Sequence, residues 1–252
     1  MSAEVVVVTG ASSGIGRACA ERFAAESAQV IACARRGDRI AALERDYPGR
    51  VRAEVLDVRD REAAENLVGR IHRDYGRIDI LVNAAGLGIG LDSIPDGDPG
   101  EWDVIFDTNV KGLLNLTKPV VSEMVRRGAG HVINIGSIAG HEMYTNGAVY
   151  CASKAAVDRI TKGLRMDILG TGVRVSTIDP GLVETEFALV RFRGDERRAA
   201  RWYEGSVALT AADVADAVWW VATRPAHVQV AELLIYPTDQ AAIRHLARRP
   251  EP

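Results

Sequence analysis

Short runs of apolar, largely β-branched residues recur along the chain, beginning with Val5 to Val8. These runs are almost continuously apolar rather than alternating with polar residues, which is typical of strands covered on both faces. Six further runs have this character: 29–33, 51–56, 78–82, 131–135, 173–178 and 233–236. We therefore predict seven buried strands.

Longer segments with helical periodicity separate the strands. Residues that favour helix starts stand at three of them: Asp38, Asp60, and Thr210 before a segment from Ala211 to Ala222. Regular alternation of strand and helix favours a parallel sheet with helices on both faces, joined by right-handed crossovers. We predict one doubly wound α/β domain of the Rossmann type over residues 1–252.

Two segments interrupt this alternation. Residues 181–206 lack a clear element and carry a charge-rich stretch around Arg191 and Arg193, which predicts a substrate-binding loop. The tail, 237–252, is predicted to pack on a partner subunit or to fray.

Composition narrows the function. The 252 residues carry a net charge of −3, which gives no basic field for nucleic acid or anionic lipid. The three cysteines form no CxxC pair, the histidines have no ligand spacing, and no apolar run approaches the ~20 residues of a membrane span. We predict a cytoplasmic protein without a metal, a membrane segment or a nucleic-acid partner.

The first strand runs into a glycine-rich turn from Gly10 to Gly16 that opens a helix. Glycines here allow a tight bend and close approach to a pyrophosphate, and the helix N-terminus offers free N–H groups. The alternative is a purely structural strand-to-helix turn. The position at the first strand–helix junction favours a dinucleotide site formed by Gly10, Ser12, Ser13, Gly14, Ile15 and Gly16.

The second strand distinguishes between the two nicotinamide cofactors. Its end carries Ala34 where an NAD site has an acidic residue, and Arg35 and Arg36 follow. Guanidinium groups bind a 2′-phosphate that a carboxylate would repel. We predict NADP(H), with Asp57 placed to bind the adenine amino group; the alternative is that both arginines are solvated.

Tyr150 and Lys154 are spaced so that both face one side of a helix beginning near Ala148. A nearby ammonium favours phenolate and so lowers the pKa of a tyrosine, which makes the phenol a proton donor and acceptor. This spacing alone is a weak signal. Ser137 adds to it, because it follows the strand 131–135 at the sheet edge where ligands bind.

At this point the sequence resembles the short-chain dehydrogenase/reductase family. The matching elements run from residue 5 to about 236 and include Thr9, Gly10, Gly14, Gly16, Asp57, Asn83, Gly86, Asn109, Ser137, Tyr150, Lys154, Pro180 and Gly181. One departure is Ala84, where the family usually has a second asparagine. Loss of that amide is expected to weaken a structural contact at the turn.

The resemblance implies a role for each matching residue. Tyr150 would be the general acid and base, Ser137 would orient the carbonyl, and Lys154 would bind the nicotinamide ribose. Asn109 would hold a water in a proton relay. Further cofactor contacts would come from Val58, Asn83, Ala84, Pro180, Gly181, Val183 and Thr185.

The substrate is less defined. Stretches from Pro180 to Val228 resemble bacterial NADP-dependent 3-hydroxy acid dehydrogenases, whereas a thinner similarity points to clavulanate-pathway aldehyde reductases. Arg191 or Arg193 would bind a substrate carboxylate, or both are solvated charges. The stretch 141–146, which includes Glu142 and Met143 and is unlike the one expected of hydroxy-acid enzymes, would form another pocket wall.

Other protein classes fit the sequence less well. Ser137 lacks the GxSxG context of a hydrolase, and the glycine turn lacks the Gly-Lys-Ser/Thr of a P-loop. A non-catalytic dinucleotide-binding protein remains an alternative. The family resemblance implies a homodimer or homotetramer. Trp219 and Trp220 are adjacent and cannot face one direction on a helix, so one is expected at a subunit interface.

Overall fold

A computed structural model describes residues 4–249, and the seven predicted strands form one parallel sheet in it. The order across the sheet is β3-β2-β1-β4-β5-β6-β9, and every neighbouring pair is parallel. The predicted doubly wound Rossmann sheet is confirmed. The strands are β1 (Val5–Thr9), β2 (Gln29–Ala34), β3 (Val51–Val55), β4 (Ile80–Asn83), β5 (Gly130–Ile135), β6 (Val173–Pro180) and β9 (Glu232–Ile235).

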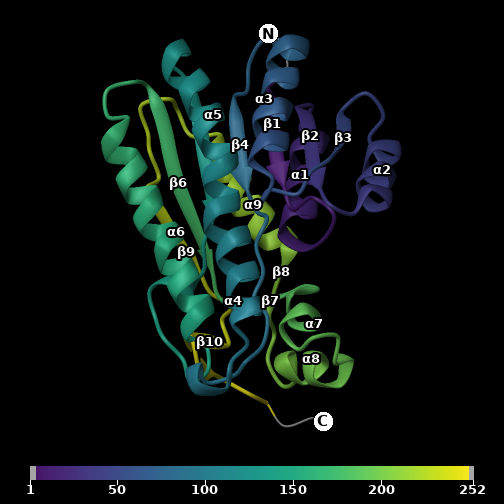
Figure 1. Ribbon diagram of the computed structural model, residues 1–252, viewed down its shortest axis with the longest axis vertical. Helices are drawn as coiled ribbons and strands as arrows, with labels where there is room; N and C mark the ends of the chain where they lie inside the picture. The colour runs from purple at the N-terminus through teal and green to yellow at the C-terminus, as the bar shows by residue number, and fades with distance from the viewer. Residues whose placement is uncertain (1–3, 250–252) are drawn as a thin grey trace.

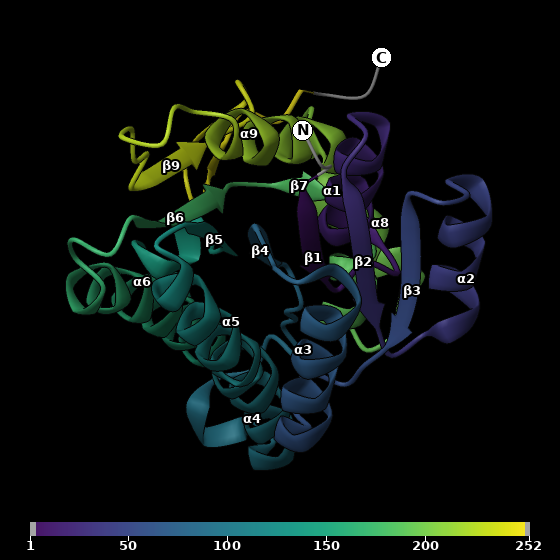
Figure 2. The ribbon, with the colours of Figure 1, turned by 90° about the horizontal axis from the view of Figure 1, so that it is seen from above.

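Helices cover both faces of the sheet (Figure 2). One face carries α1 (Gly14–Ala25), α2 (Gly37–Asp46) and α9 (Ala211–Ala222). The other carries α3 (Arg61–Tyr75), α5 (Leu113–Arg127) and α6 (Ala148–Asp167), with α4 (Pro99–Phe106) and the π-helical turn η2 (Asp107–Gly112) leading into α5. Val6 and Val8 pack into the core beneath α1, α2 and α9, and Val5 and Val7 pack into the core on the other face of the sheet. Both faces of β1 are thus buried, which explains its unbroken apolar run.

Two of the three predicted helix starts are confirmed. Asp60 caps α3 by accepting a hydrogen bond from Ala63 N (2.9 Å), and Thr210 caps α9 in a capping box with Asp213. Asp38 instead lies in the first turn of α2, which begins at Gly37. Its carboxylate still favours the helix there because it faces the positive end of the helix dipole.

Residues 181–206 are not the structureless loop that we predicted. They form the short strand β7 (Val183–Glu184) and the helices α7 (Phe187–Arg191) and α8 (Glu196–Tyr203), and β7 pairs with β8 (Leu209–Thr210). Asp195 caps α8 by accepting from Arg198 N (3.0 Å). The charge-rich stretch therefore divides between the end of α7, where Arg191 is buried, and the start of the capped, exposed helix α8.

The tail folds back on its own chain. It forms a hairpin of β10 (Gln240–Ala242) and β11 (His245–Leu246), at the end of the molecule that also carries α7 and α8 (Figure 1). Asp239 ties the tail down by accepting from Val207 N (2.9 Å) and pairing with Arg249 (3.0 Å). Residues 237–249 therefore do not fray, and packing of the tail on a partner subunit stays a prediction; the last three residues lie outside the described ones.

No helix within residues 4–249 has both the length and the apolar character needed to cross a bilayer. The short turns η1 (Ile94–Asp96) and η3 (Ile138–Gly140) follow β4 and β5. Ser137 is the residue that precedes and caps the second of these turns.

Candidate active site

A cavity of about 400 Å³ opens at the carboxyl ends of the strands, the edge where open α/β sheets bind ligands. Ser137, Tyr150 and Lys154 line it. Most of the predicted cofactor-binding residues line it as well: Gly10, Ser12, Ser13, Gly14, Ile15, Gly16, Arg35, Arg36, Asp57, Val58, Ala84, Pro180, Gly181, Val183 and Thr185. The fold thus brings residues from seven segments of the chain onto one wall.

The turn between β1 and α1 requires glycine at two positions. Gly10 has φ +69°, and a Cβ on it would lie 2.9 Å from Ala84 O. A Cβ on Gly16 would lie 2.5 Å from Gly10 O. Ser13, the residue that precedes α1, makes no side-chain capping bond. The first N–H groups of α1 are therefore suited to binding an anion such as phosphate.

Arg36 reaches back from the end of β2 to this turn. Its guanidinium donates to Ser12 Oγ (3.0 and 3.1 Å), Ser13 Oγ (2.6 Å) and Glu186 (2.9 Å). Arg39, on the first turn of α2, binds the same Glu186 carboxylate. Hydrogen bonds from Arg39 and then Arg36 lower the pKa of Glu186. Two guanidinium groups thus share one anion at the edge where the sequence predicts a 2′-phosphate.

Asp57 and Val58 form the neighbouring wall. The Arg59 guanidinium donates to the Asp57 carboxylate at 2.6 and 3.0 Å, and this hydrogen bonding lowers the pKa of Asp57. An ionised carboxylate retains further lone pairs that can accept from an exocyclic amino group. The geometry is compatible with the predicted adenine contact.

The turn after β4 lacks the family's second asparagine but is held in another way. The Thr9 hydroxyl accepts hydrogen bonds from Ala84 N (3.1 Å) and Ala85 N (3.0 Å). The Asn83 side chain points away from the cavity into a buried network, donating to Thr117 Oγ1 (3.0 Å) and Asn134 Oδ1 (2.9 Å). Its amide is therefore part of the packing behind the site, and its side chain is not a cavity wall.

Helix α6 places Tyr150 and Lys154 one turn apart, and both side chains are buried. The Ser137 hydroxyl, delivered by β5, hydrogen-bonds with the Tyr150 hydroxyl. The ring of Phe187 packs against that of Tyr150, with centroids 5.3 Å apart. Proton donor, orienting hydroxyl and apolar cover thus meet at one point of the cavity.

Burial dominates the acid–base properties of this pair. It raises the pKa of Tyr150, opposed by the Ser137 hydrogen bond and the Arg191 guanidinium. We expected Lys154 to lower that pKa, but the Lys154 ammonium instead donates to Ile135 O (2.9 Å). Burial also lowers the pKa of Lys154 to about 8, against the opposing charge of Asp179.

Asn109 lies in the π-helical turn η2. Its side chain accepts from Leu87 N (2.8 Å) and donates to Leu87 O (2.8 Å) and Ser153 Oγ (3.0 Å). A Cβ on Gly86 would lie 3.3 Å from Asn109 Oδ1 and 3.5 Å from Lys154 Nζ, so the two side chains flank that glycine. Asn109 lies just behind the cavity wall, and its predicted relay role remains a prediction.

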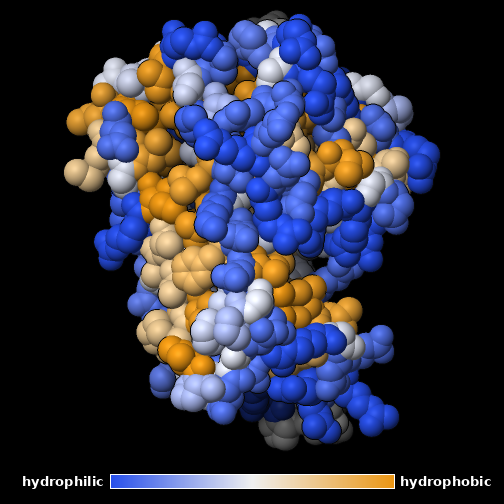
Figure 3. All heavy atoms as spheres, in the orientation of Figure 1, coloured by the Kyte–Doolittle hydropathy of each residue, from blue (hydrophilic) through white to orange (hydrophobic). Residues whose placement is uncertain are grey.

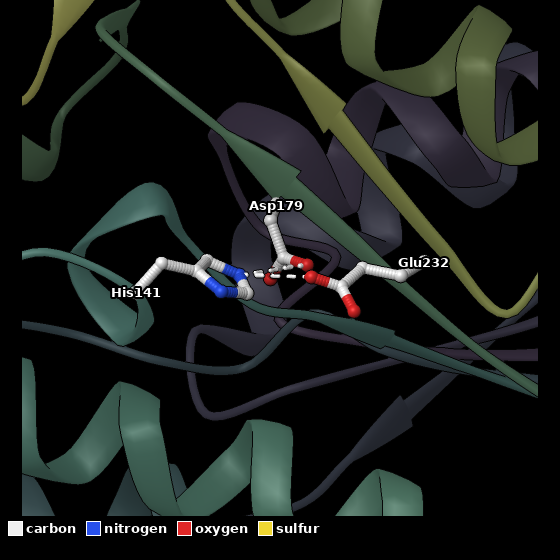
Figure 4. Close-up of side chains that lie close together, drawn as sticks. All are labelled: His141, Asp179 and Glu232. Carbon is white, nitrogen blue, oxygen red and sulfur yellow. Dashed lines mark ion pairs between the residues drawn. The ribbon is translucent and has the colours of Figure 1, made fainter.

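The side chains of His141, Asp179 and Glu232 point toward one another (Figure 4), and one of them, Asp179, bonds to Ser137. The buried Asp179 accepts from Ser137 N (3.0 Å) and from the Thr177 hydroxyl. His141 Nε2 lies 3.4 Å from both Asp179 and Glu232, whose other oxygen pairs with Lys162 (3.3 Å). The ligand-type atoms of His141, Asp179 and Glu232 lie within 4.8 Å of one another. Protein groups already bond to these carboxylates, so the cluster acts as a support for Ser137.

Of the residues predicted for substrate binding, Ser137 lines the cavity, whereas the others lie outside its wall. Glu142 accepts from Ile243 N (3.0 Å) and Tyr236 Oη (3.3 Å), and Met143 is 65% exposed. Arg193 is held by Glu101 (2.6 Å) and Asp92.

Arg191 is buried, donates to Tyr144 Oη (2.9 Å) and lies 5.3 Å above the Tyr150 ring. It thus touches the candidate proton donor, although it does not line the cavity.

Tyr144, in the stretch 141–146 that we predicted to form a pocket wall, lines the cavity on its substrate side. Four other residues on this side were not predicted: Trp202, Gln240, Ile243 and Arg244. The five residues come from the turn after η3, from α8 and from the tail hairpin. No local motif marks them, because only the folding of remote segments brings them together.

The family model for short chain dehydrogenases matches residues 4–195. The chain belongs to the short chain dehydrogenase family. The predicted family, oxidoreductase class and fold of this short-chain dehydrogenase are confirmed.

Named relatives cover nearly the whole chain. NADP-dependent 3-hydroxy acid dehydrogenase YdfG of Escherichia coli (strain K12) is 44% identical over 94% of this chain and 96% of its own. Sulfoacetaldehyde reductase 2 of Chromohalobacter salexigens is 42% identical over the same shares. The closed form of serine dehydrogenase complexed with NADP⁺ superposes with a TM-score of 0.93 and 42% identity, over 98% of this chain and 100% of that one.

Proposed function

We propose that this short-chain dehydrogenase transfers hydride between NADP(H) and a small polar alcohol or carbonyl compound, with a 3-hydroxy acid as the substrate class. One observation carries the proposal: Ser137, Tyr150 and Lys154 meet on the wall of the cavity whose other end holds the glycine turn and Arg36. The relatives support the substrate class, since a 3-hydroxy acid, serine and sulfoacetaldehyde are all small, polar compounds that carry a carboxylate or sulfonate group.

NADP(H) supplies or accepts the hydride when it is bound, and the chain handles the proton. In reduction the Tyr150 hydroxyl donates its proton to the carbonyl oxygen; in oxidation the phenolate takes the proton from the alcohol. The Ser137 hydroxyl orients that oxygen, because it already lies against the Tyr150 hydroxyl. Lys154 binds the nicotinamide ribose, and Asn109 holds the water of the relay.

The choice of NADP(H) rests on the basic edge of the cavity. Arg35 and Arg36 line it, and Ala34 stands where a carboxylate would repel a 2′-phosphate. Both the YdfG enzyme and the serine dehydrogenase structure carry NADP in their names. We expect kcat/KM to favour NADP(H) over NAD(H), and a preference for NAD(H) would contradict this assignment.

Tyr150→Phe tests the proton-transfer role. It should retain less than a few per cent of wild-type kcat while binding NADPH normally, because only the hydroxyl is removed. Tyr75→Phe, at the end of the remote α3, is the matched control and should behave as wild type. Substantial kcat in Tyr150→Phe would refute the assignment.

A substrate panel separates the remaining functions. NADPH oxidation with aldehydes, ketones and 3-oxo acids, and NADP⁺ reduction with 3-hydroxy acids, should favour the acids. Preference for neutral aldehydes would favour the aldehyde-reductase alternative. No turnover with any compound, together with tight NADPH binding, would favour a non-catalytic dinucleotide-binding protein.

We also propose that the chain acts in the cytoplasm as a homodimer or homotetramer. Apolar side chains gather along the side of the molecule where α6 and α5 lie (Figure 3). Large apolar residues of α5 and of α6 with the turn after it are exposed: Leu114 by 41%, Met166 by 77% and Leu169 by 86%. Such a surface is typical of a subunit interface. Sedimentation of a monomer alone at micromolar concentration would contradict the oligomer, and fractionation of cells tests the location.

A further inference from the structure

Arg244 stands at the turn of the tail hairpin, between β10 and β11, and lines the same cavity as Ser137 and Tyr150. Its neighbour Ile243 packs against the apolar cluster that contains Tyr150. The tail therefore brings a guanidinium to the substrate side of the site, far from the glycine turn.

Two aromatic rings hold this guanidinium from two other elements. It lies 4.7 Å from the centroid of the Tyr144 ring and 5.1 Å from that of Trp202. Aromatic faces attract a guanidinium and fix its plane while leaving its N–H groups able to donate. Within residues 4–249 Arg244 forms no ion pair with a carboxylate. Its charge is thus positioned but not neutralised by a described side chain.

The other charges of the cavity make this cation distinctive. The two acidic residues among the lining side chains are Asp57 and Glu186, and both are bonded to arginines at the cofactor end. The substrate side therefore carries positive charge without a compensating lining carboxylate. An anion bound there would gain Coulomb attraction and forked hydrogen bonds.

We propose that Arg244 receives the anionic group of the substrate, a carboxylate or a sulfonate, and that the tail hairpin thereby selects acids over neutral alcohols. This inference rests on the proposed function and adds the residue that selects the substrate. A carboxylate and a sulfonate both present negatively charged oxygens that can accept hydrogen bonds from a guanidinium group. Separate titrations with a carboxylate and a sulfonate ligand distinguish them.

Glu142 has a different role from the one first assigned to it. Its carboxylate accepts from Ile243 N (3.0 Å), the residue next to Arg244, and from Tyr236 Oη (3.3 Å). Asp239 holds the other end of the hairpin through Val207 N. Glu142 is therefore a positioning residue that acts on the substrate through Arg244.

The test measures binding without turnover. The enzyme–NADPH complex is titrated calorimetrically with 3-hydroxypropanoate, 2-hydroxyethanesulfonate and the neutral 3-hydroxypropanamide. Three variants are compared with wild type: Arg244→Met, which keeps the apolar stem; Arg244→Lys, which keeps the charge; and Arg197→Met, an exposed cation of α8 outside the cavity wall, as control. KM values from turnover complete the comparison.

Wild type should bind at least one of the two anions about tenfold more tightly than the amide. The anion that it prefers shows whether the anionic group of the substrate is a carboxylate or a sulfonate. Arg244→Met should lose that preference, Arg244→Lys should keep part of it, and Arg197→Met should match wild type. NADPH affinity should remain unchanged throughout, which excludes misfolding as the cause.

Two results would overturn the inference: Arg244→Met keeping the preference for the anion, or losing affinity for anion and amide equally. The proposed function fails separately. Arg244-dependent anion binding without turnover of any hydroxy acid would leave this inference standing and refute the function. Normal turnover of hydroxy acids that Arg244→Met leaves unchanged would support the proposed function and refute this inference.

Discussion

Lys154→Met should stabilise the folded protein while abolishing its activity. Lys154 is 8% exposed, and burial lowers its pKa from 10.5 to about 8. Because one pKa unit corresponds to about 1.36 kcal/mol, folding with a protonated Lys154 costs about 3 kcal/mol at pH 7. Methionine removes this cost but also the hydrogen bond to Ile135 O, worth ~1 kcal/mol. The net gain is ~2 kcal/mol.

The sign of the pH dependence follows from the lowered pKa. Below pH 8 Lys154 is protonated in both the folded and the unfolded chain, so the full cost is present. Between pH 8 and 10.5 the folded protein releases the proton first, and the cost declines. Above pH 10.5 both forms are neutral, so the advantage of methionine should vanish.

Thermal unfolding at pH 7 and above pH 10.5, at fixed protein concentration, measures this difference. A gain of ~2 kcal/mol corresponds to a Tm increase of ~4–8 °C for a chain of this size. Lys162→Met on the same helix is the matched control, because Lys162 pairs with the buried Asp158 at 2.6 Å and its removal should lower Tm. A Lys154→Met protein less stable than wild type at pH 7, or equally favoured above pH 10.5, would refute the reasoning.

Four further substitutions probe other parts of the structure. Arg36→Leu should reduce the preference for NADP over NAD in kcat/KM about tenfold or more, since a charge-assisted hydrogen bond is worth ~1.5–3 kcal/mol. Glu186→Gln, which frees Arg36, should lower KM for NADP(H) without changing KM for NAD(H). Equal effects on the two cofactors would contradict the phosphate site. Asp179→Asn should move the alkaline limb of the kcat/KM profile to lower pH, because Asp179 opposes the lowering of the Lys154 pKa by burial, whereas a shift to higher pH would contradict it. Thr210→Ala should cost ~1 kcal/mol of stability and leave kcat/KM unchanged, and a loss of activity would count against a purely capping role.

The sheet and its helices could be predicted because their signals are local. Val5 to Val8 divide between two cores, and that two-sided burial is what the continuous apolar run encodes. The cap at Thr210 is equally local, since it depends on a residue three positions away. Charge density in 191–198 was misleading, because this stretch contains the end of α7 and the start of the exposed helix α8, and an exposed helix is as polar as a loop.

Within the site, too, the features that depend on neighbouring residues could be predicted, whereas those that depend on remote elements could not. The glycine turn and the Tyr150–Lys154 pair depend on neighbours within a turn or two, so local spacing, together with Ser137 and the family resemblance, was enough to predict them. The pKa of Tyr150 did not follow from spacing, because it depends on burial and on Ser137 and Arg191, which come from other elements. A sequence pattern places a side chain on a helix face but carries no information about what else buries it.

The substrate wall depends entirely on long-range packing. Tyr144, Trp202 and Arg244 are separated by 58 and 42 positions, yet the rings of the first two flank the guanidinium of the third. Glu142 illustrates the consequence: its region was predicted to form a wall, but its carboxylate bonds to the hairpin instead of facing the cavity. Hydride and proton transfer depend on the locally encoded half, so relatives can share them while differing in the hairpin. If members of this family differ in substrate, we therefore expect their sequences to differ first in the tail and not in the helix that carries Tyr150.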